Sequence, residues 1–94
     1  MFSIKRAKDG HILLVGRLDA AQVDRARNYF RSVTESCTLD FTDLDYISSA
    51  GLGFLLGTQK RLSESGHKLK LVNMNKYIRD IFRIAGFDNI FDIE

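Results

Sequence analysis

The sequence predicts a single α/β domain with a mixed sheet of about four to five strands, in the element order β-β-α-β-α-β-α. Apolar residues change along the chain between the alternating spacing of strands and the three-to-four-residue spacing of helices. Helices between consecutive strands favour right-handed crossovers and parallel pairing after an opening hairpin. With 94 residues, 45% hydrophobic and 28% charged, the chain suits one hydrophobic core, so residues 1–94 are assigned to one domain.

The first strands are expected to form the hairpin. Phe2, Ile4 and Ala7 alternate with polar residues, residues 8–10 supply a turn, and residues 11–15 form an aliphatic run. From Asp19 the period becomes helical, and Asp19 or a near neighbour is expected to cap the first helix. The predicted buried face of this helix comprises Val23, Ala26, Phe30 and Val33.

A short strand over residues 38–41 and an irregular loop over residues 42–47 are expected next, with acidic side chains at Asp40, Asp43 and Asp45. A second helix is predicted from Ser48 or Ser49 to Gly66. Its residues predicted to face the sheet are Leu52, Leu55, Leu56 and Leu62.

The remaining chain predicts a strand, a helix and a short end segment. Residues 68–72 form the strand. Asn75 is expected to cap the last helix and Gly86 to end it. Residues 91–93 are either a short edge strand or a tail.

The strand, loop and helix start over residues 39–53 carry most of the functional information. A helix start has unpaired backbone N–H groups and the positive end of the helix dipole, which stabilise an anion by roughly 0.3–1 kcal/mol. A phosphate on a serine is one such anion. Ser48 and Ser49 are therefore candidates for phosphorylation or, alternatively, ordinary N-cap residues.

The outer face of this helix predicts a docking site for a protein. Glycines on an exposed helix face cost on the order of 1 kcal/mol each relative to alanine, and an outward Phe54 adds apolar surface. Alternatively, Phe54 packs under a neighbouring loop. The predicted contact residues are Ser48, Ser49, Gly51, Gly53, Phe54, Gly57 and Arg61.

Residues 39–62 resemble the signature of the STAS domain (sulfate transporter and anti-sigma factor antagonist). The matching segments are Asp40-Phe41-Thr42 and Ile47-Ser48-Ser49-Ala50-Gly51-Leu52. The likeness is greatest to the small, stand-alone bacterial anti-sigma factor antagonists. It also extends over residues 16–19 and residues 81–87, and it implies a STAS-like fold.

The resemblance implies a phosphorylation switch. In the family, the serine two residues before the Gly-Leu pair is phosphorylated by the partner anti-sigma factor, a serine kinase, and that position here is Ser49. The unphosphorylated antagonist binds the anti-sigma factor and frees the sigma factor; phosphorylation ends the binding, and a serine phosphatase restores it. Two residues depart from the family pattern: Ser48, where Asp is common, and Ala50, where Ser or Thr is common.

Other function classes have little support in the sequence. The chain has two histidines, His11 and His67, and no G-x-S-x-G motif, so we expect no hydrolase and no other enzyme activity. The glycines of the second helix have the spacing G-x-G-x-x-x-G, which is not that of a dinucleotide loop, and no Cys/His cluster has metal-ligand spacing. We therefore expect no cofactor and no metal. A formal charge of +2, evenly spread, predicts no nucleic-acid partner.

The sequence also predicts a cytoplasmic protein without membrane insertion. It has no signal peptide, no apolar run of membrane-spanning length, and a single cysteine, Cys37. The alternative function is a STAS subunit of another assembly, either a stress-sensing complex or a lipid-transport ABC complex. Such a subunit would share the docking face and lack the reversible serine phosphate.

Overall fold

The computed structural model describes all 94 residues and contains one mixed sheet of six strands. The strands are β1 (Phe2–Arg6), β2 (Ile12–Leu18), β3 (Cys37–Asp40), β4 (Leu44–Ile47), β5 (Leu69–Val72) and β6 (Asp92–Ile93). Strands β1 and β2 pair antiparallel, as the predicted hairpin requires, and every other pair is parallel. The order across the sheet is β1-β2-β3-β5-β6, with β4 beside the second half of β2.

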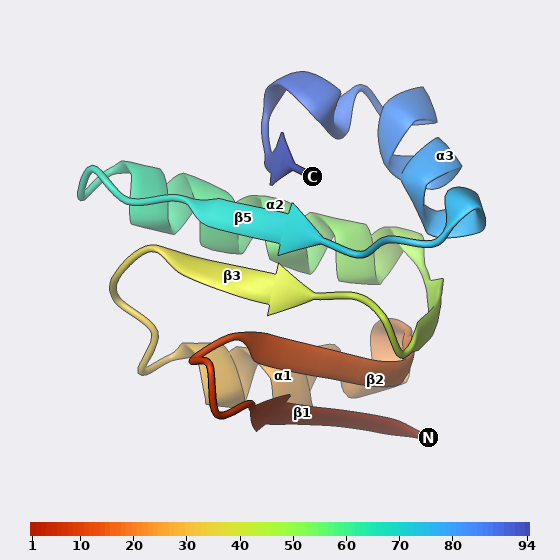
Figure 1. Ribbon diagram of the computed structural model, residues 1–94, viewed down its shortest axis with the longest axis horizontal. Helices are drawn as coiled ribbons and strands as arrows, with labels where there is room; N and C mark the ends of the chain where they lie inside the picture. The colour runs from red at the N-terminus through yellow and green to blue at the C-terminus, as the bar shows by residue number, and fades with distance from the viewer.

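Three helices complete the fold. They are α1 (Val23–Phe30), α2 (Ser49–Ser63) and α3 (Lys76–Ile84), with single 3₁₀ turns at Ala20–Gln22 and Phe87–Asn89. Figure 1 shows α1 and α2 side by side behind the sheet and no helix in front of the strands, while α3 lies beyond β5. The sheet therefore has one face covered by helices and one open face, which explains why its strands alternate between buried and partly exposed residues.

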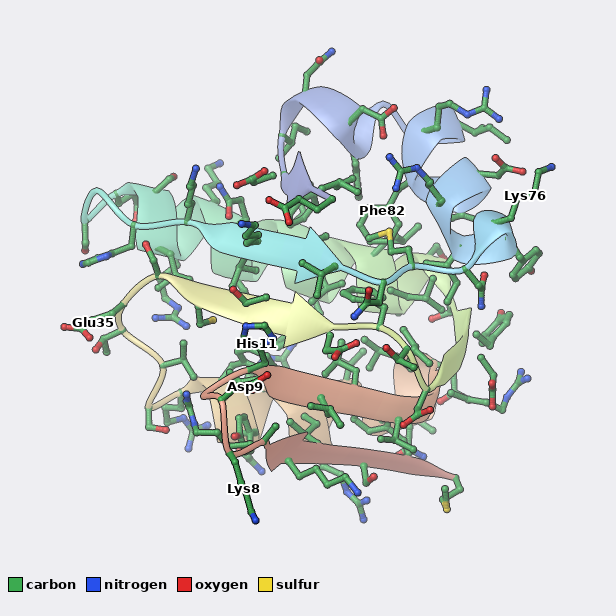
Figure 2. The ribbon with its side chains drawn as sticks, viewed as in Figure 1. Lys8, Asp9, His11, Glu35, Lys76 and Phe82 are labelled. Carbon is green, nitrogen blue, oxygen red and sulfur yellow. The ribbon has the colours of Figure 1, made fainter.

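The core lies between the sheet and the helices. Residues Ile12, Leu14 and Leu18 of β2 are almost fully buried, as are Leu69 and Leu71 of β5. A second group of aromatic rings, in edge-to-face or tilted contact, attaches α3 to the end of the sheet: Phe41, Phe82, Phe87 and Phe91. Figure 2 shows Phe82 on the side of α3 nearest to β5. The whole chain thus forms one packed unit.

Most predicted elements are confirmed, including the cap of the last helix, where Asn75 accepts from the N–H of Ile78. Asp19 caps the 3₁₀ turn that leads into α1 by accepting from the N–H of Ala21, whereas α1 itself begins after Gln22, whose side chain makes no capping hydrogen bond. The edge-strand alternative for the end of the chain is confirmed, since residues 92 and 93 form β6. Two predictions are wrong. The sheet has six strands and not four to five, because the predicted irregular loop over residues 42–47 contains β4. Val33, which was expected on the first helix, lies beyond the end of α1 but is buried.

The backbone at Gly16 allows β2 to pair with both β3 and β4. Its φ is +91°, and a Cβ there would lie 2.1 Å from the carbonyl oxygen of Met1, so only glycine fits. The register of β2 against β4 shifts between Gly16 and Arg17. The first part of β2 pairs with β3 through Ile12 and Leu13, and its second part, from Gly16 to Leu18, pairs with β4 across this irregularity. Strand β4 then leads directly into α2.

Candidate protein-binding site on the second helix

The start of α2 is packed closely against the end of β2. The N–H of Ser48 donates to the carbonyl of Leu18 at 3.0 Å. Gly51 is buried, and a Cβ at this position would lie 2.7 Å from the carbonyl oxygen of Leu18 and 2.9 Å from the Ile47 side chain. Gly51 was predicted to contact a partner, but its burial leaves little of it accessible. A glycine is required at this position because any side chain would keep the helix start from approaching the sheet.

The two serines at the start of α2 have different environments. Ser48 has an extended backbone and its Oγ accepts from the N–H of Gly51 at 3.2 Å, so it is the N-cap. Ser49 is the first residue of the helix, it is exposed, and its hydroxyl makes no hydrogen bond within the chain. The ordinary capping role therefore belongs to Ser48, and the Ser49 hydroxyl is free for chemistry.

The buried face of α2 is partly as predicted. Leu55 and Leu62 are almost fully buried, which confirms the helical phase. Leu52 and Leu56, which were also expected to be buried, are only half-buried, and Thr58 is buried in their place, with its hydroxyl donating to the carbonyl of Phe54 at 2.9 Å. The difference arises because α2 packs against α1 as well as against the sheet, so its buried arc turns toward α1.

Phe54 does not point into solvent as expected. It is half-buried, and its ring lies edge-to-face against the ring of Phe30 in α1, with 5.6 Å between the ring centroids. The alternative, packing under a loop, is also wrong, because the neighbour is a helix. The edge-to-face contact contributes about 0.5–1.5 kcal/mol beyond the burial of area. Phe54 therefore joins α2 to α1, and only part of its ring is available to a partner.

Arg61 has a structural role that the sequence did not indicate. Its guanidinium donates to the carbonyl of Phe30 at 3.0 Å and to that of Val33 at 2.9 Å. Both carbonyls lie at or just beyond the end of α1, where helix carbonyls lack partners within the helix. Arg61 thus holds the end of α1 against α2.

A groove of about 430 Å³ runs between α1 and α2. Gly53 and Gly57 lie along it and are exposed, and a Cβ at either position would meet no atom within 4 Å. Arg27 of α1 and Arg31, the residue that follows α1, also line the groove. Helical spacing alone did not indicate that these two arginines face α2, because the sheet sets how α1 lies beside α2. The groove is lined by Arg27, Phe30, Arg31, Gly53, Phe54, Gly57, Thr58 and Arg61.

The acidic loop before α2 has a structural explanation at Asp40. One carboxylate oxygen accepts from the N–H of Thr42 at 2.9 Å, from its hydroxyl at 2.6 Å and from the side-chain amide of Asn73 at 3.2 Å. Partial burial acts to raise the pKa of Asp40, but these hydrogen bonds together outweigh it, and the pKa lies below its usual value. Asp40 therefore ties the β3–β4 turn to the end of β5.

The structure brings no catalytic partner to Ser49. His11 precedes β2 and faces Asp9 at 3.5 Å, and both lie at the β1–β2 turn in Figure 2. His67 follows the far end of α2, a helix of 15 residues or about 22 Å, and contacts Ser36. Burial raises the pKa of the Cys37 thiol, against the opposing effect of Arg6. No cluster of three potential metal ligands is present, and none of the helices has the length and apolar character needed to cross a membrane.

The comparisons with known proteins agree with this architecture. A model of the STAS domain family matches residues 4–94. The chain belongs to the STAS domain family. Among solved structures, the STAS fold of this chain is similar to a candidate anti-sigma factor antagonist from Thermotoga maritima, with a TM-score of 0.79 and 22% identity over 99% of this chain and 85% of that one. It is also similar to the Bacillus cell fate determinant SpoIIAA in its phosphorylated form, with a TM-score of 0.71 and 19% identity over 100% and 91% of the two chains.

Curated relatives of this STAS domain are named for sigma-factor regulation. The chain is 38% identical over 74 residues to BtrV of Bordetella bronchiseptica, which is named as a candidate anti-sigma factor antagonist. It is 39% identical over 51 residues to the anti-sigma-B factor antagonist of Bacillus subtilis. These matches cover 79% and 54% of this chain, and 58% and 47% of the two relatives. The chain thus aligns with about half the length of each relative.

Proposed function

We propose that this STAS domain is an anti-sigma factor antagonist. It binds an anti-sigma factor with serine kinase activity through the start and outer face of α2, and it thereby releases a sigma factor. Phosphorylation of Ser49 by that kinase ends the binding, and a serine phosphatase restores it. The names of the two curated relatives support the regulatory class. The domain acts in this scheme as a substrate and binding partner and has no catalytic activity of its own.

The observation that carries the proposal is the difference between the two serines. Ser48 is occupied as the N-cap of α2, whereas the hydroxyl of Ser49 is exposed and makes no hydrogen bond within the chain. A kinase can therefore reach Ser49 without breaking the cap. Ala50, the next residue, has no hydroxyl that could compete.

A phosphate on Ser49 would change the surface and preserve the fold. It adds about −1.5 to −2 charge at neutral pH and a bulky hydrated group. The positive end of the α2 dipole and the unpaired N–H groups of the first turn stabilise this charge in the free protein. In a complex, the same charge must be desolvated against the partner, which disfavours binding. The switch therefore requires no rearrangement of the domain.

Phosphorylation is tested by incubating the protein with its purified anti-sigma factor kinase and ATP, followed by mass spectrometry. We expect one phosphate on Ser49, none in Ser49→Ala, and an unchanged site in Ser48→Ala, which is the matched control. Phosphate on Ser48 in place of Ser49, or full labelling of Ser49→Ala, would show that the acceptor is wrongly assigned. Binding without any phosphorylation would favour a STAS subunit of another kind of assembly.

Binding is tested by calorimetry with the same kinase. Ser49→Ala should bind with unchanged affinity, because it removes one exposed hydroxyl. Ser49→Asp should fold, because a carboxylate suits a helix start, and should bind at least about tenfold more weakly, which corresponds to 1.4 kcal/mol. Gly57→Gln should also weaken binding, because the new glutamine side chain would project from the exposed face of α2 and block the close approach of the partner. Equal affinities for all three variants would contradict the proposed surface.

A further inference from the structure

On its α2 side, the groove between α1 and α2 is lined by two glycines that the packing of the fold does not require. Glycine is among the least favourable residues inside a helix, yet α2 has glycine at positions 53 and 57, one turn apart, where a Cβ would meet nothing within 4 Å. Internal packing explains Gly51 and leaves Gly53 and Gly57 unexplained. Because Gly53 and Gly57 have no side chains, another polypeptide can approach the helix backbone closely along this side of two adjacent turns.

The groove is positively charged. Three arginines line it, Arg27 and Arg31 on the side of α1 and Arg61 on α2, and no acidic residue does. Arg61 donates to two carbonyls at the end of α1, which does not neutralise its charge. Arg27 pairs with Asp24 at 2.6 Å in an exposed ion pair, which is weak and exchangeable, whereas the exposed Arg31 makes no side-chain hydrogen bond or ion pair. Arg61 already donates to the carbonyls at the end of α1, so the guanidinium of Arg31 is not needed there as a hydrogen-bond donor.

This combination favours carboxylates on a polypeptide. A guanidinium presents donors in a planar fork that matches a carboxylate. The two aromatic rings in the groove, Phe30 and Phe54, pack against each other and Phe30 is almost fully buried, so they offer no free pair of faces to hold a base or another flat ligand. Ser49, Gly53 and Gly57 are spaced four residues apart on α2, so one partner covering Ser49 can continue along the glycines into the groove.

We propose that the groove between α1 and α2 binds an acidic segment of the anti-sigma factor, with Arg31 and Arg27 pairing with its carboxylates while its backbone runs over Gly53 and Gly57. The inference rests on the proposed function for the identity of the partner and adds α1 to the interface. It also assigns the charge of the partner's contacting segment. Ser49 then controls one end of the interface, and the arginines select the partner at the other.

The experiment measures the affinity of the purified anti-sigma factor kinase for Arg31→Glu, Arg31→Lys and Arg79→Glu at low and moderate salt. Arg79 is exposed on α3 and makes no side-chain hydrogen bond, so its reversal gives the same change in net charge away from the groove. We expect Arg31→Glu to bind about tenfold or more weakly and Arg79→Glu to stay within about threefold of the wild type. Arg31→Lys keeps the charge and loses the planar fork, so its affinity should lie between those of the other two variants. The loss should shrink as salt rises, because exposed charges are screened.

A second measurement identifies the segment. Acidic surface residues of the kinase are changed singly to Arg, and one such change should restore affinity for Arg31→Glu without restoring it for Ser49→Asp. Equal affinities for Arg31→Glu and Arg79→Glu would overturn the groove proposal. If Ser49→Asp still weakens binding in that case, the proposed function stands and only the groove assignment fails. If the wild type does not bind the kinase, both proposals fail.

Discussion

The start of α2 and its groove-facing side contain glycine for opposite reasons. At the helix start, Gly51 is buried against Leu18, and the fold leaves no room for a Cβ. Along the groove, Gly53 and Gly57 face open space, and a Cβ would strengthen the helix. Glycine in the first region is therefore explained by internal packing, whereas internal packing leaves glycine in the second without an explanation. Residue type alone does not separate these roles, although the three positions lie within seven residues of one helix.

The largest effect that tests this contrast between the glycines is expected at Gly51, at the start of α2. Gly51→Val should lower the free energy of unfolding by about 3 kcal/mol, the upper end of the cost of overpacking, because the new side chain collides with the backbone of β2. Urea denaturation followed by circular dichroism measures this change, with Gly53→Val as the matched control on the open side. A Gly51→Val protein as stable as this control would show that α2 can shift away from β2.

Breaking the contact between α2 and α1 at Arg61 should cause the next largest loss in the free energy of unfolding. Arg61→Met keeps the aliphatic stem and removes both hydrogen bonds to the carbonyls at the end of α1, so the free energy of unfolding should fall by about 2 kcal/mol. Thermal denaturation compares it with Arg79→Met on α3, whose side chain makes no hydrogen bond. Equal midpoints for the two variants would mean that Arg61 does not hold the groove together.

The two serines allow a finer test. Ser48→Ala should cost about 1 kcal/mol, because it removes the N-cap of α2. Ser49→Ala should change stability by less than about 0.5 kcal/mol, because the hydroxyl it removes is exposed and unbonded. Chemical denaturation of both variants side by side gives the answer. The reverse order of stability would transfer the capping role to Ser49 and weaken its assignment as a free acceptor.

A last substitution should have an effect of the opposite sign. Gly57→Ala should raise the free energy of unfolding by about 0.8 kcal/mol, because it improves helix propensity without a collision. Differential scanning calorimetry should therefore show a higher midpoint than that of the wild type. A lower midpoint would indicate that the fold itself needs this glycine, and the contrast with Gly51 would disappear.

The sequence by itself determined the parts of the molecule that local patterns control. The alternation of the hairpin, the helical spacing of Leu55 and Leu62 and the caps Asp19 and Asn75 all depend on neighbours within a few residues. The motif that leads into α2 was also evident, because strand, serines and glycine follow one another along the chain. These features were confirmed in the structure.

Only the tertiary structure decided which side chains meet across elements. Strand β4 has four residues and pairs with the distant β2, across the register shift between Gly16 and Arg17. The contact of Phe54 with Phe30, the bonds from Arg61 to the end of α1 and the arginines of the groove all depend on how α1 and α2 pack on one sheet. Such contacts join residues more than twenty positions apart, and their geometry is set by the packing of the whole core, which no local spacing encodes.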